Sequence, residues 1–188
     1  MPKLNAITDD IFTVSEFFTP TECEDYIRLA ESEGFSDAPI NTALGPQLRQ
    51  DVRNNSRVMI DDVDLAEQLW NRAADYIPKT LDGWSAVGVN ERLRFYRYEI
   101  GQQFDWHYDG AFERLDGDRS RLTFMIYLNE DCEGGQTSFE KTVIVPETGM
   151  ALFFVHQALH KGQPVTKGRK YVLRTDVMFR IKASDTAT

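Results

Sequence analysis

The sequence predicts an α+β fold that is mainly β, with an antiparallel sandwich or barrel preceded by two helices. Three observations support this class. Short β-rich runs alternate with glycine and proline turns from Val87 onward, two amphipathic patterns lie before them, and no internal repeat is present. The length of 188 residues fits a single domain, 1–188, with a helical N-terminal part at 1–86 and a β core at 87–182.

The first helix is predicted from the residues at its two ends. Thr19 is a suitable N-cap, Pro20 fits the first helical position, and Glu22 completes a capping box. Gly34 is a typical helix terminator. The apolar residues between these ends recur at helical spacing, so one face of the helix is expected to pack on the outside of a sheet.

A second helix is predicted from about Asp64 to Ile77, because apolar residues recur every four positions there and Pro78 follows. The stretch between the two helices, Ser36 to Arg57, is polar and contains glycine, proline and asparagine. It is expected to form loops that flank short strands.

The strands of the β core are predicted from runs of β-branched and aromatic residues between turn residues. These runs are Val87–Ile100, Phe104–Tyr108, Leu122–Leu128, Thr137–Phe139, Thr142–Val145, Met150–Val155 and Lys170–Ile181.

Composition narrows the function classes. The chain has 21 Lys and Arg against 30 Asp and Glu, a net charge of −9, which argues against nucleic acid as a partner. Cys23 and Cys132 cannot form a disulfide framework and are expected to be reduced thiols. The first residues lack the apolar core of a signal peptide, and the longest apolar run, Met150–Val155, is too short to cross a membrane. We therefore expect a cytoplasmic protein without a membrane partner; its oligomeric state stays open.

Histidines are the rarest candidates for chemistry, and the chain has three: His107, His156 and His160. On an extended chain His107 and Asp109 point to the same side, so they can offer an imidazole and a carboxylate to one metal ion. The third ligand is then His156 or His160. Two histidines and one carboxylate form the facial triad of non-haem Fe(II) oxygenases, although an isolated H-x-D pair is more often a simple polar contact.

The surrounding sequence resembles the prolyl 4-hydroxylase-like branch of the Fe(II)- and 2-oxoglutarate-dependent dioxygenases, over residues 93 to 180. The residues that carry the resemblance are Tyr98-x-x-Gly101, His107-x-Asp109, Gly134-Gly135-x-Thr137-x-Phe139, Gly149 before an apolar strand, and His160 with Lys170 ten residues later. The resemblance implies a double-stranded β-helix, or jelly roll, with 87–182 as the catalytic core and with the substrate loops in 1–86.

The resemblance also implies roles for single residues. His107, Asp109 and His160 take the iron-ligand positions, which leaves His156 a supporting role. Lys170 takes the position that pairs with the distal carboxylate of 2-oxoglutarate, and a cation there is needed because an unpaired carboxylate in a barrel interior is costly. Tyr98 is expected to hydrogen-bond the same carboxylate. Arg174 is expected to support a carboxylate of the cosubstrate or of the substrate.

The reaction implied is hydroxylation of an unactivated C–H bond. Fe(II) is the metal cofactor, 2-oxoglutarate and O₂ are consumed, succinate and CO₂ are the coproducts, and ascorbate is an optional reductant. The substrate is an amino acid, a peptidyl residue such as proline, or a small metabolite. Candidate substrate residues are Arg53, Asn55 and Arg57 in the polar stretch and Phe112 in the loop after Asp109. A solvated loop explains the first three about equally well.

Two other classes remain open from sequence. One is a non-catalytic barrel that binds metal without turnover. The other is a cupin-like enzyme or hydrolase that uses Zn²⁺ or Mn²⁺, which would need neither Lys170 nor Tyr98. The Gly134-Gly135 pair is interpreted as a turn without a chemical role.

Overall fold

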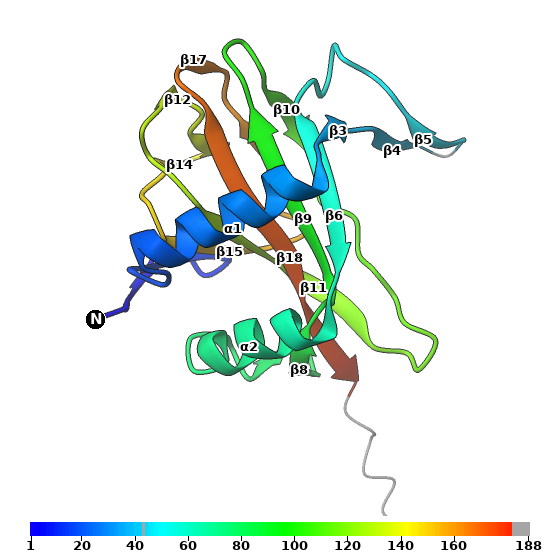
Figure 1. Cartoon of the computed structure of the whole chain (residues 1–188). Coiled ribbons are helices and arrows are strands. Elements are labelled where there is room, and N and C mark those ends of the chain that lie inside the picture. The colour runs from blue at the N-terminus through cyan, green and yellow to red at the C-terminus, as the bar shows by residue number, and fades with distance from the viewer. Residues whose placement is uncertain (43, 182–188) are drawn as a thin grey trace, which may run out of the picture.

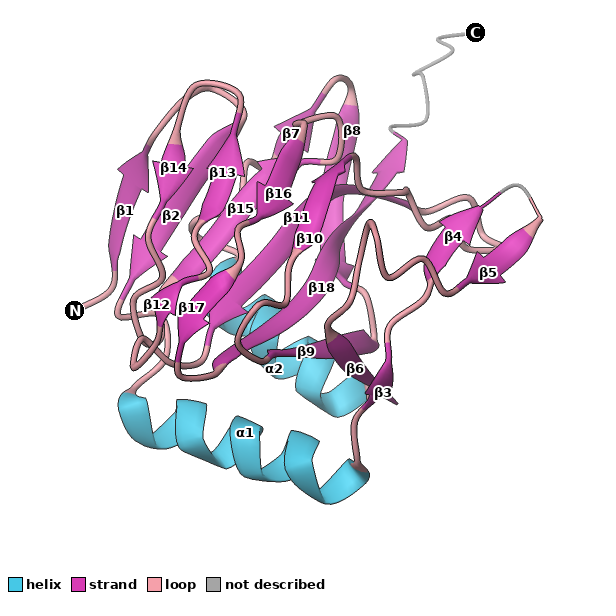
Figure 2. Cartoon of the chain, turned by 90° about the horizontal axis from the view of Figure 1, so that it is seen from above, coloured by secondary structure: helices cyan, strands magenta, loops and turns pink. Residues whose placement is uncertain are grey.

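A large antiparallel sheet forms the centre of the molecule, and a smaller sheet and two helices cover its opposite faces (Figures 1 and 2). The computed structural model describes residues 1–42 and 44–181. Over these residues the large sheet has the neighbour order β1 (Lys3–Ala6), β2 (Ile11–Ser15), β15 (Ala151–Val155), β11 (Arg119–Tyr127), β18 (Lys170–Ile181), β9 (Arg92–Tyr98), β6 (Ser56–Asp61) and β3 (Ser36–Asp37). The C-terminal part of β18 also pairs with β8 (Trp84–Val89), which pairs with β7 (Thr80–Leu81).

The smaller sheet faces the large one in Figure 2 and carries part of the candidate site. Its order is β10 (Phe104–His107), β16 (His160–Gly162), β13 (Thr137–Phe139) and β14 (Val143–Ile144). Two further pairs of strands lie outside these sheets, namely β12 (Glu133–Gly134) with β17 (Val165–Lys167), and β4 (Ile40–Thr42) with β5 (Gly45–Gln47).

Helix α1 (Pro20–Glu33) begins with the predicted capping box. The backbone N–H of Glu22 donates to Thr19 Oγ1 over 3.2 Å, and the N–H of Thr19 donates to Glu22 Oε2 over 2.8 Å. The predicted start and the end at Gly34 are confirmed. In the described chain, neither helix has the length and apolar character needed to span a membrane.

Helix α2 (Val63–Ala73) begins where Asp62 accepts a hydrogen bond from the N–H of Leu65 over 2.9 Å. The predicted end at Ile77 is wrong, because the helix stops at Ala73 and a turn closed by Tyr76 N–H and Ala73 O follows. Ile77 is still buried, so its place in the apolar spacing reflects packing of the segment after the helix and not a longer helix. The residue before a proline avoids helical geometry, which favours the early end.

The large sheet separates two apolar cores. On one face α1 and α2 pack against residues that include Phe95, Phe124 and Leu173, as the sequence analysis expected. On the other face Tyr96 and Val172 pack with residues of the smaller sheet. Successive residues of a strand point to opposite faces, so β9 and β18 serve both cores and carry the candidate site on the face away from the helices.

Two features of the large sheet differ from the sequence analysis. The run Val87–Ile100 is two strands, because the chain turns between β8 and β9, where Asn90 N–H donates to Asp176 O over 2.8 Å. Strands β1 and β2 were not predicted. The segment 1–86 thus adds five strands to the large sheet within the described residues, namely β1, β2, β3, β6 and β7, besides the start of β8 and its two helices.

Candidate metal centre

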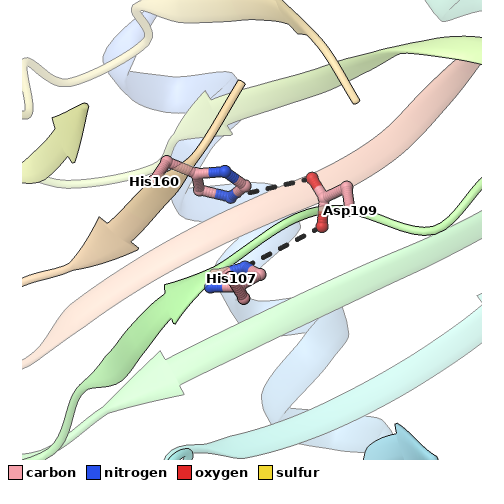
Figure 3. Close-up of side chains that lie close together, drawn as sticks. All are labelled: His107, Asp109 and His160. Atoms are coloured by element: carbon pink, nitrogen blue, oxygen red, sulfur yellow. Dashed lines mark ion pairs between the residues drawn. The ribbon is translucent and has the colours of Figure 1, made fainter. Parts of the chain in front are cut away.

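Two strands of the smaller sheet and the loop that follows β10 bring His107, Asp109 and His160 together (Figure 3). His107 ends β10, His160 begins β16, and the two are cross-strand partners. One ligand atom from each of the three residues lies within 4.8 Å of the others. The Nε2 atoms of His107 and His160 lie 3.9 and 3.8 Å from the two carboxylate oxygens of Asp109. The described residues therefore include a cluster with the donor set of a facial triad.

Both imidazoles are held in the form that binds metal. Nδ1 of His107 lies 2.7 Å from the carbonyl oxygen of Asp105, and Nδ1 of His160 lies 2.9 Å from that of Ala158. A carbonyl only accepts, so each Nδ1 carries the hydrogen and each Nε2 lone pair is available at the centre. Burial lowers the pKa of His107 to about 4 and also lowers the pKa of His160. Both rings are therefore neutral at pH 7, as a metal ligand must be.

The carboxylate of Asp109 is held through one of its oxygens. Thr123 Oγ1 donates to Asp109 Oδ2 over 2.5 Å, and Arg174 Nη2 lies 3.2 Å from the same atom. Burial alone would raise the pKa of Asp109, but the charge of Arg174 and the neighbouring imidazoles and hydroxyl hold that pKa well below its usual range. Asp109 is therefore ionised, and Oδ1 is the oxygen that these two contacts leave for a metal ion.

His156, the other candidate for third ligand, lies behind Thr123 and outside the cluster. It is buried, with Nε2 2.9 Å from Ser120 Oγ and Nδ1 3.1 Å from Thr123 Oγ1. Because Thr123 gives its one hydroxyl hydrogen to Asp109, His156 must donate from Nδ1. The structure places His156 as a support for the residue that holds Asp109.

A pocket opens beside the cluster, between the two sheets. Its lining residues are Tyr96, Tyr98, Phe104, His107, Asp109, Met125, Thr137, His160, Gly162, Lys170, Val172 and Arg174. Lys170, Tyr98 and Arg174, predicted from sequence as cosubstrate residues, thus lie around one space with the three candidate ligands.

Lys170 is a buried cation without an anionic partner. Its side chain is 3% exposed, and Nζ donates to the carbonyl of Gly135 over 2.5 Å. Nζ also lies 5.3 and 5.1 Å from the ring centroids of Tyr98 and Tyr127. No carboxylate in the described chain forms an ion pair with it, and burial lowers its pKa to about 8. Such an ammonium fits one end of a dianionic ligand, since an unpaired buried charge is costly.

Three residues around Lys170, namely Gly135, Tyr127 and Thr137, had no chemical role predicted from the sequence. Gly135 has φ of +68°, and a Cβ there would lie 2.9 Å from Cδ of Lys170. The glycine is therefore what admits the lysine side chain. Tyr127 donates its hydroxyl to Thr137 Oγ1 over 2.6 Å beside Lys170. The Gly-Gly-x-Thr pattern was visible in the sequence, but its positive φ was not.

The predicted substrate residues separate into two places. Arg53 is buried, and its guanidinium lies 4.6 and 4.4 Å from the ring centroids of Tyr96 and Phe104. Asn55 is also buried and accepts from Arg53 Nε over 2.7 Å. Arg57 lies on β6, opposite Tyr96 in register.

Phe112 does not line the pocket. It lies in a separate depression with Asp61, Asn90, Glu91 and Arg92. Its backbone N–H nevertheless donates to Ser120 Oγ over 2.8 Å, which links it to His156.

Residues 93–175 match the family described as the 2OG-Fe(II) oxygenase superfamily. Probable prolyl 4-hydroxylase 8 of Arabidopsis thaliana is 25% identical over 197 residues, covering 85% of this chain and 65% of that protein. The viral collagen prolyl hydroxylase of Paramecium Bursaria Chlorella virus-1, solved with 2-oxoglutarate, superposes with a TM-score of 0.66 at 20% identity, over 90% of this chain and 96% of that one. A Trichoplax adhaerens prolyl hydroxylase, solved with a hypoxia inducible factor peptide, gives 0.67 at 18% identity, over 90% and 84%.

The solved structures show that the fold is a double-stranded β-helix, as predicted from the sequence, and the matched family and the triad are those of Fe(II)- and 2-oxoglutarate-dependent dioxygenases. Residues 93–175 are similar to the 2OG-Fe(II) oxygenase superfamily, and the whole chain is similar to prolyl 4-hydroxylases. The curated relative is longer, and the chain spans about two thirds of it.

Proposed function

We propose that the protein hydroxylates an unactivated C–H bond of a peptidyl residue, an amino acid or a small metabolite. One observation carries the proposal. The triad His107, Asp109 and His160 shares a pocket with the buried, unpaired ammonium of Lys170. A hydrolase or a plain metal-binding barrel has no need for that ammonium, whereas a dioxygenase with a dianionic cosubstrate does.

The residues present fit Fe(II) and 2-oxoglutarate. His107 and His160 offer neutral Nε2 atoms, and Asp109 offers an ionised carboxylate. Lys170 and Tyr98 would hold the distal carboxylate. Iron and 2-oxoglutarate, when bound, supply the activation of O₂, with succinate and CO₂ as coproducts. The chain supplies ligand orientation through Asp105, Ala158 and Thr123, and the two sheets exclude water.

A carboxylate ligand supports hydroxylation over halogenation, because no ligand position is left to a halide. A peptide substrate is supported by the relative solved with a peptide, and a prolyl residue by the relatives' names. Ascorbate as a reductant and a cytoplasmic location are further parts of the proposal.

Anaerobic titration of Fe(II) and 2-oxoglutarate into the protein, followed by visible absorbance, tests the proposal. We expect a weak charge-transfer band that needs both components, is lost in His160→Ala and is kept in His156→Ala. A screen of peptides and amino acids for succinate release then identifies substrates. Absence of the band, together with tight binding of Zn²⁺ or Mn²⁺, would favour the cupin-like or hydrolase class instead.

A further inference from the structure

Three arginines gather on the site face of the large sheet, on neighbouring strands. Arg94 on β9 is the cross-strand partner of Arg174 on β18, and Arg57 on β6 is the partner of Tyr96 on β9. Tyr96 and Arg94 are two residues apart, so all of these side chains share one face. Arg174 and Tyr96 line the pocket, which identifies this face as the one beside the metal cluster.

The carboxylates near these arginines do not balance them. Asp176, 1% exposed, is shared, with Oδ2 3.3 Å from Arg94 Nη1 and Oδ1 3.0 Å from Arg174 Nη2. Asp109 is the only other carboxylate that pairs with the group in the described chain, and it is a candidate metal ligand. Arg53 and Arg57 form no ion pair with any described residue. The four arginines Arg53, Arg57, Arg94 and Arg174 therefore carry two more positive charges than Asp109 and Asp176 balance, in a protein of net charge −9.

Arg57 is the member most in need of an anion. It is half-buried, and burial lowers its pKa. The charges of Arg53, Arg94 and Arg174 act in the same direction, against a single opposing contribution from Tyr96. Holding several guanidinium groups together in a partly dry site is unfavourable unless an anion joins them.

Donor atoms for an anion are also left without partners. Arg53 Nη2 and Arg174 Nε are buried and make no hydrogen bond in the described chain. Arg53 is 5% exposed, so its missing partner is not replaced by bulk water. Buried donors normally have acceptors, and the exceptions need an explanation. A bound anion with more than one oxygen atom would accept hydrogen bonds from both of these arginine donors.

The cosubstrate does not account for Arg57. Lys170, the expected partner of its distal carboxylate, lies on β18, and Arg57 lies on β6, with β9 between them. Neighbouring strands are about 4.8 Å apart, so β6 and β18 are separated by about 10 Å. Arg57 therefore lies out of reach of the carboxylate that Lys170 is expected to bind, beside Tyr96 of the pocket.

We propose that Arg57, supported by Arg53 and Arg94, binds a carboxylate of the substrate, so that the enzyme acts on acidic substrates. The inference rests on the proposed function and specifies its substrate class. Planar guanidinium groups match a carboxylate through paired hydrogen bonds, which is why arginine suits this role. The carboxylate belongs either to an Asp or Glu side chain in a peptide or to a free amino acid.

The test compares acids with amides in the protein loaded with Fe(II) and 2-oxoglutarate. Capped tetrapeptides with one Asp or Glu are matched with their Asn and Gln counterparts, and free alanine and proline, whose one carboxylate is the α-carboxylate, with their α-amides. Binding is read anaerobically from the shift in thermal unfolding and from changes in the charge-transfer band; turnover is read as succinate release. We expect acids to exceed amides by about tenfold or more.

Variants assign the effect to Arg57. Arg57→Gln should lose the preference for acids, and Arg57→Lys should keep part of it. The control is Arg97→Gln, which removes the same charge from the opposite face of β9, where Arg97 pairs with Glu31. Equal effects of acids and amides on the wild type, or equal behaviour of Arg57→Gln and Arg97→Gln, would overturn the inference.

The two proposals fail in different ways. If the charge-transfer band forms but acids and amides behave alike, the substrate class is wrong and the dioxygenase stands. If the band does not form, the proposed function fails, and the thermal shifts of wild type and Arg57→Gln with the acid probes still decide whether Arg57 binds a carboxylate. Preference for peptide acids over free amino acids, or the reverse, identifies which carboxylate is bound.

Discussion

Thr123 gives its hydroxyl hydrogen to Oδ2 of Asp109 and receives one from Nδ1 of His156. The direction is fixed because a hydroxyl has one hydrogen and an ionised carboxylate only accepts. Nε2 of His156 then accepts from Ser120, whose Oγ accepts from the N–H of Phe112. A one-way chain of hydrogen bonds thus runs from the loop after the metal cluster back to the carboxylate ligand.

Thr123→Val should weaken Fe(II) binding by about 10- to 100-fold, because supporting hydrogen bonds orient metal ligands. The variant should also lose about 1–3 kcal/mol of stability, since Nδ1 of His156 is left buried without an acceptor. Equilibrium dialysis and thermal unfolding measure the two effects. Thr123→Ser keeps the hydroxyl and is the control; equal affinity in Thr123→Val and wild type would show that the chain of hydrogen bonds does not support the metal.

His107→Ala and Asp109→Ala should each abolish Fe(II) binding and turnover while the fold remains. Each change removes one of three donors of the cluster. Circular dichroism checks the fold, and dialysis checks the metal. Fe(II) retained at wild-type affinity in either variant would mean that the metal lies elsewhere.

Lys170→Ala should raise the 2-oxoglutarate requirement by about 10- to 100-fold, the usual effect of losing a charged hydrogen bond to an anion. The KM for 2-oxoglutarate measures it, at saturating substrate and Fe(II). Arg174→Ala is the comparison, because Arg174 lines the same pocket but also contacts Asp109. If only Arg174→Ala raises this KM, the cosubstrate cation is Arg174.

Affinity for 2-oxoglutarate should fall as the pH rises above about 8. Burial lowers the pKa of Lys170 to about 8, so the amine is charged below that pH and largely neutral above it. Binding a dianion above this pH requires uptake of a proton, which raises the KM by up to about tenfold per pH unit. Lys170→Arg stays charged and should give a flatter profile. A wild-type KM that is constant from pH 7 to pH 9.5 would contradict the expectation.

Gly135→Ala should destabilise the protein by about 1–3 kcal/mol and raise the KM for 2-oxoglutarate. The added Cβ needs a positive φ and lies 2.9 Å from Cδ of Lys170, so it displaces the lysine. Gly88→Ala is the control, because nothing lies within 4 Å of a Cβ there and its φ is not positive. Thermal unfolding and steady-state kinetics compare the two. A normal KM in Gly135→Ala would show that Lys170 has room to move.

The features predictable from the sequence were those fixed by local rules. The capping box at Thr19 and Glu22 needs only two side chains at the right spacing. The pairing of His107 with Asp109 needs only an extended chain, and the structure does bring them to one point. The same rules gave most strands of the β core.

Other features depend on contacts between distant segments. Strand β2 becomes a strand by pairing with β15, about 140 residues later, and a five-residue run gives little signal of it alone. The early end of α2 depends on its packing and on the turn that follows it. Arg174 contacts Asp109 because the pairing of β18 with β11 places Arg174 near Thr123, which donates to Asp109. No local sequence pattern predicts that register.

The hairpin of β1 and β2 protects the large sheet from pairing with other molecules in solution. Strand β2 pairs with β15, and the ring centroids of Phe12 and Phe153 stack 4.8 Å apart. Strand β1 is exposed along its length and is the edge strand of the large sheet. Removing residues 1–15 would leave the backbone groups of β15 unpaired along one edge and Phe153 without its stacking partner. Unpaired edge strands pair with strands of other molecules, so we expect such a truncation to cause self-association before any change at the three candidate metal ligands.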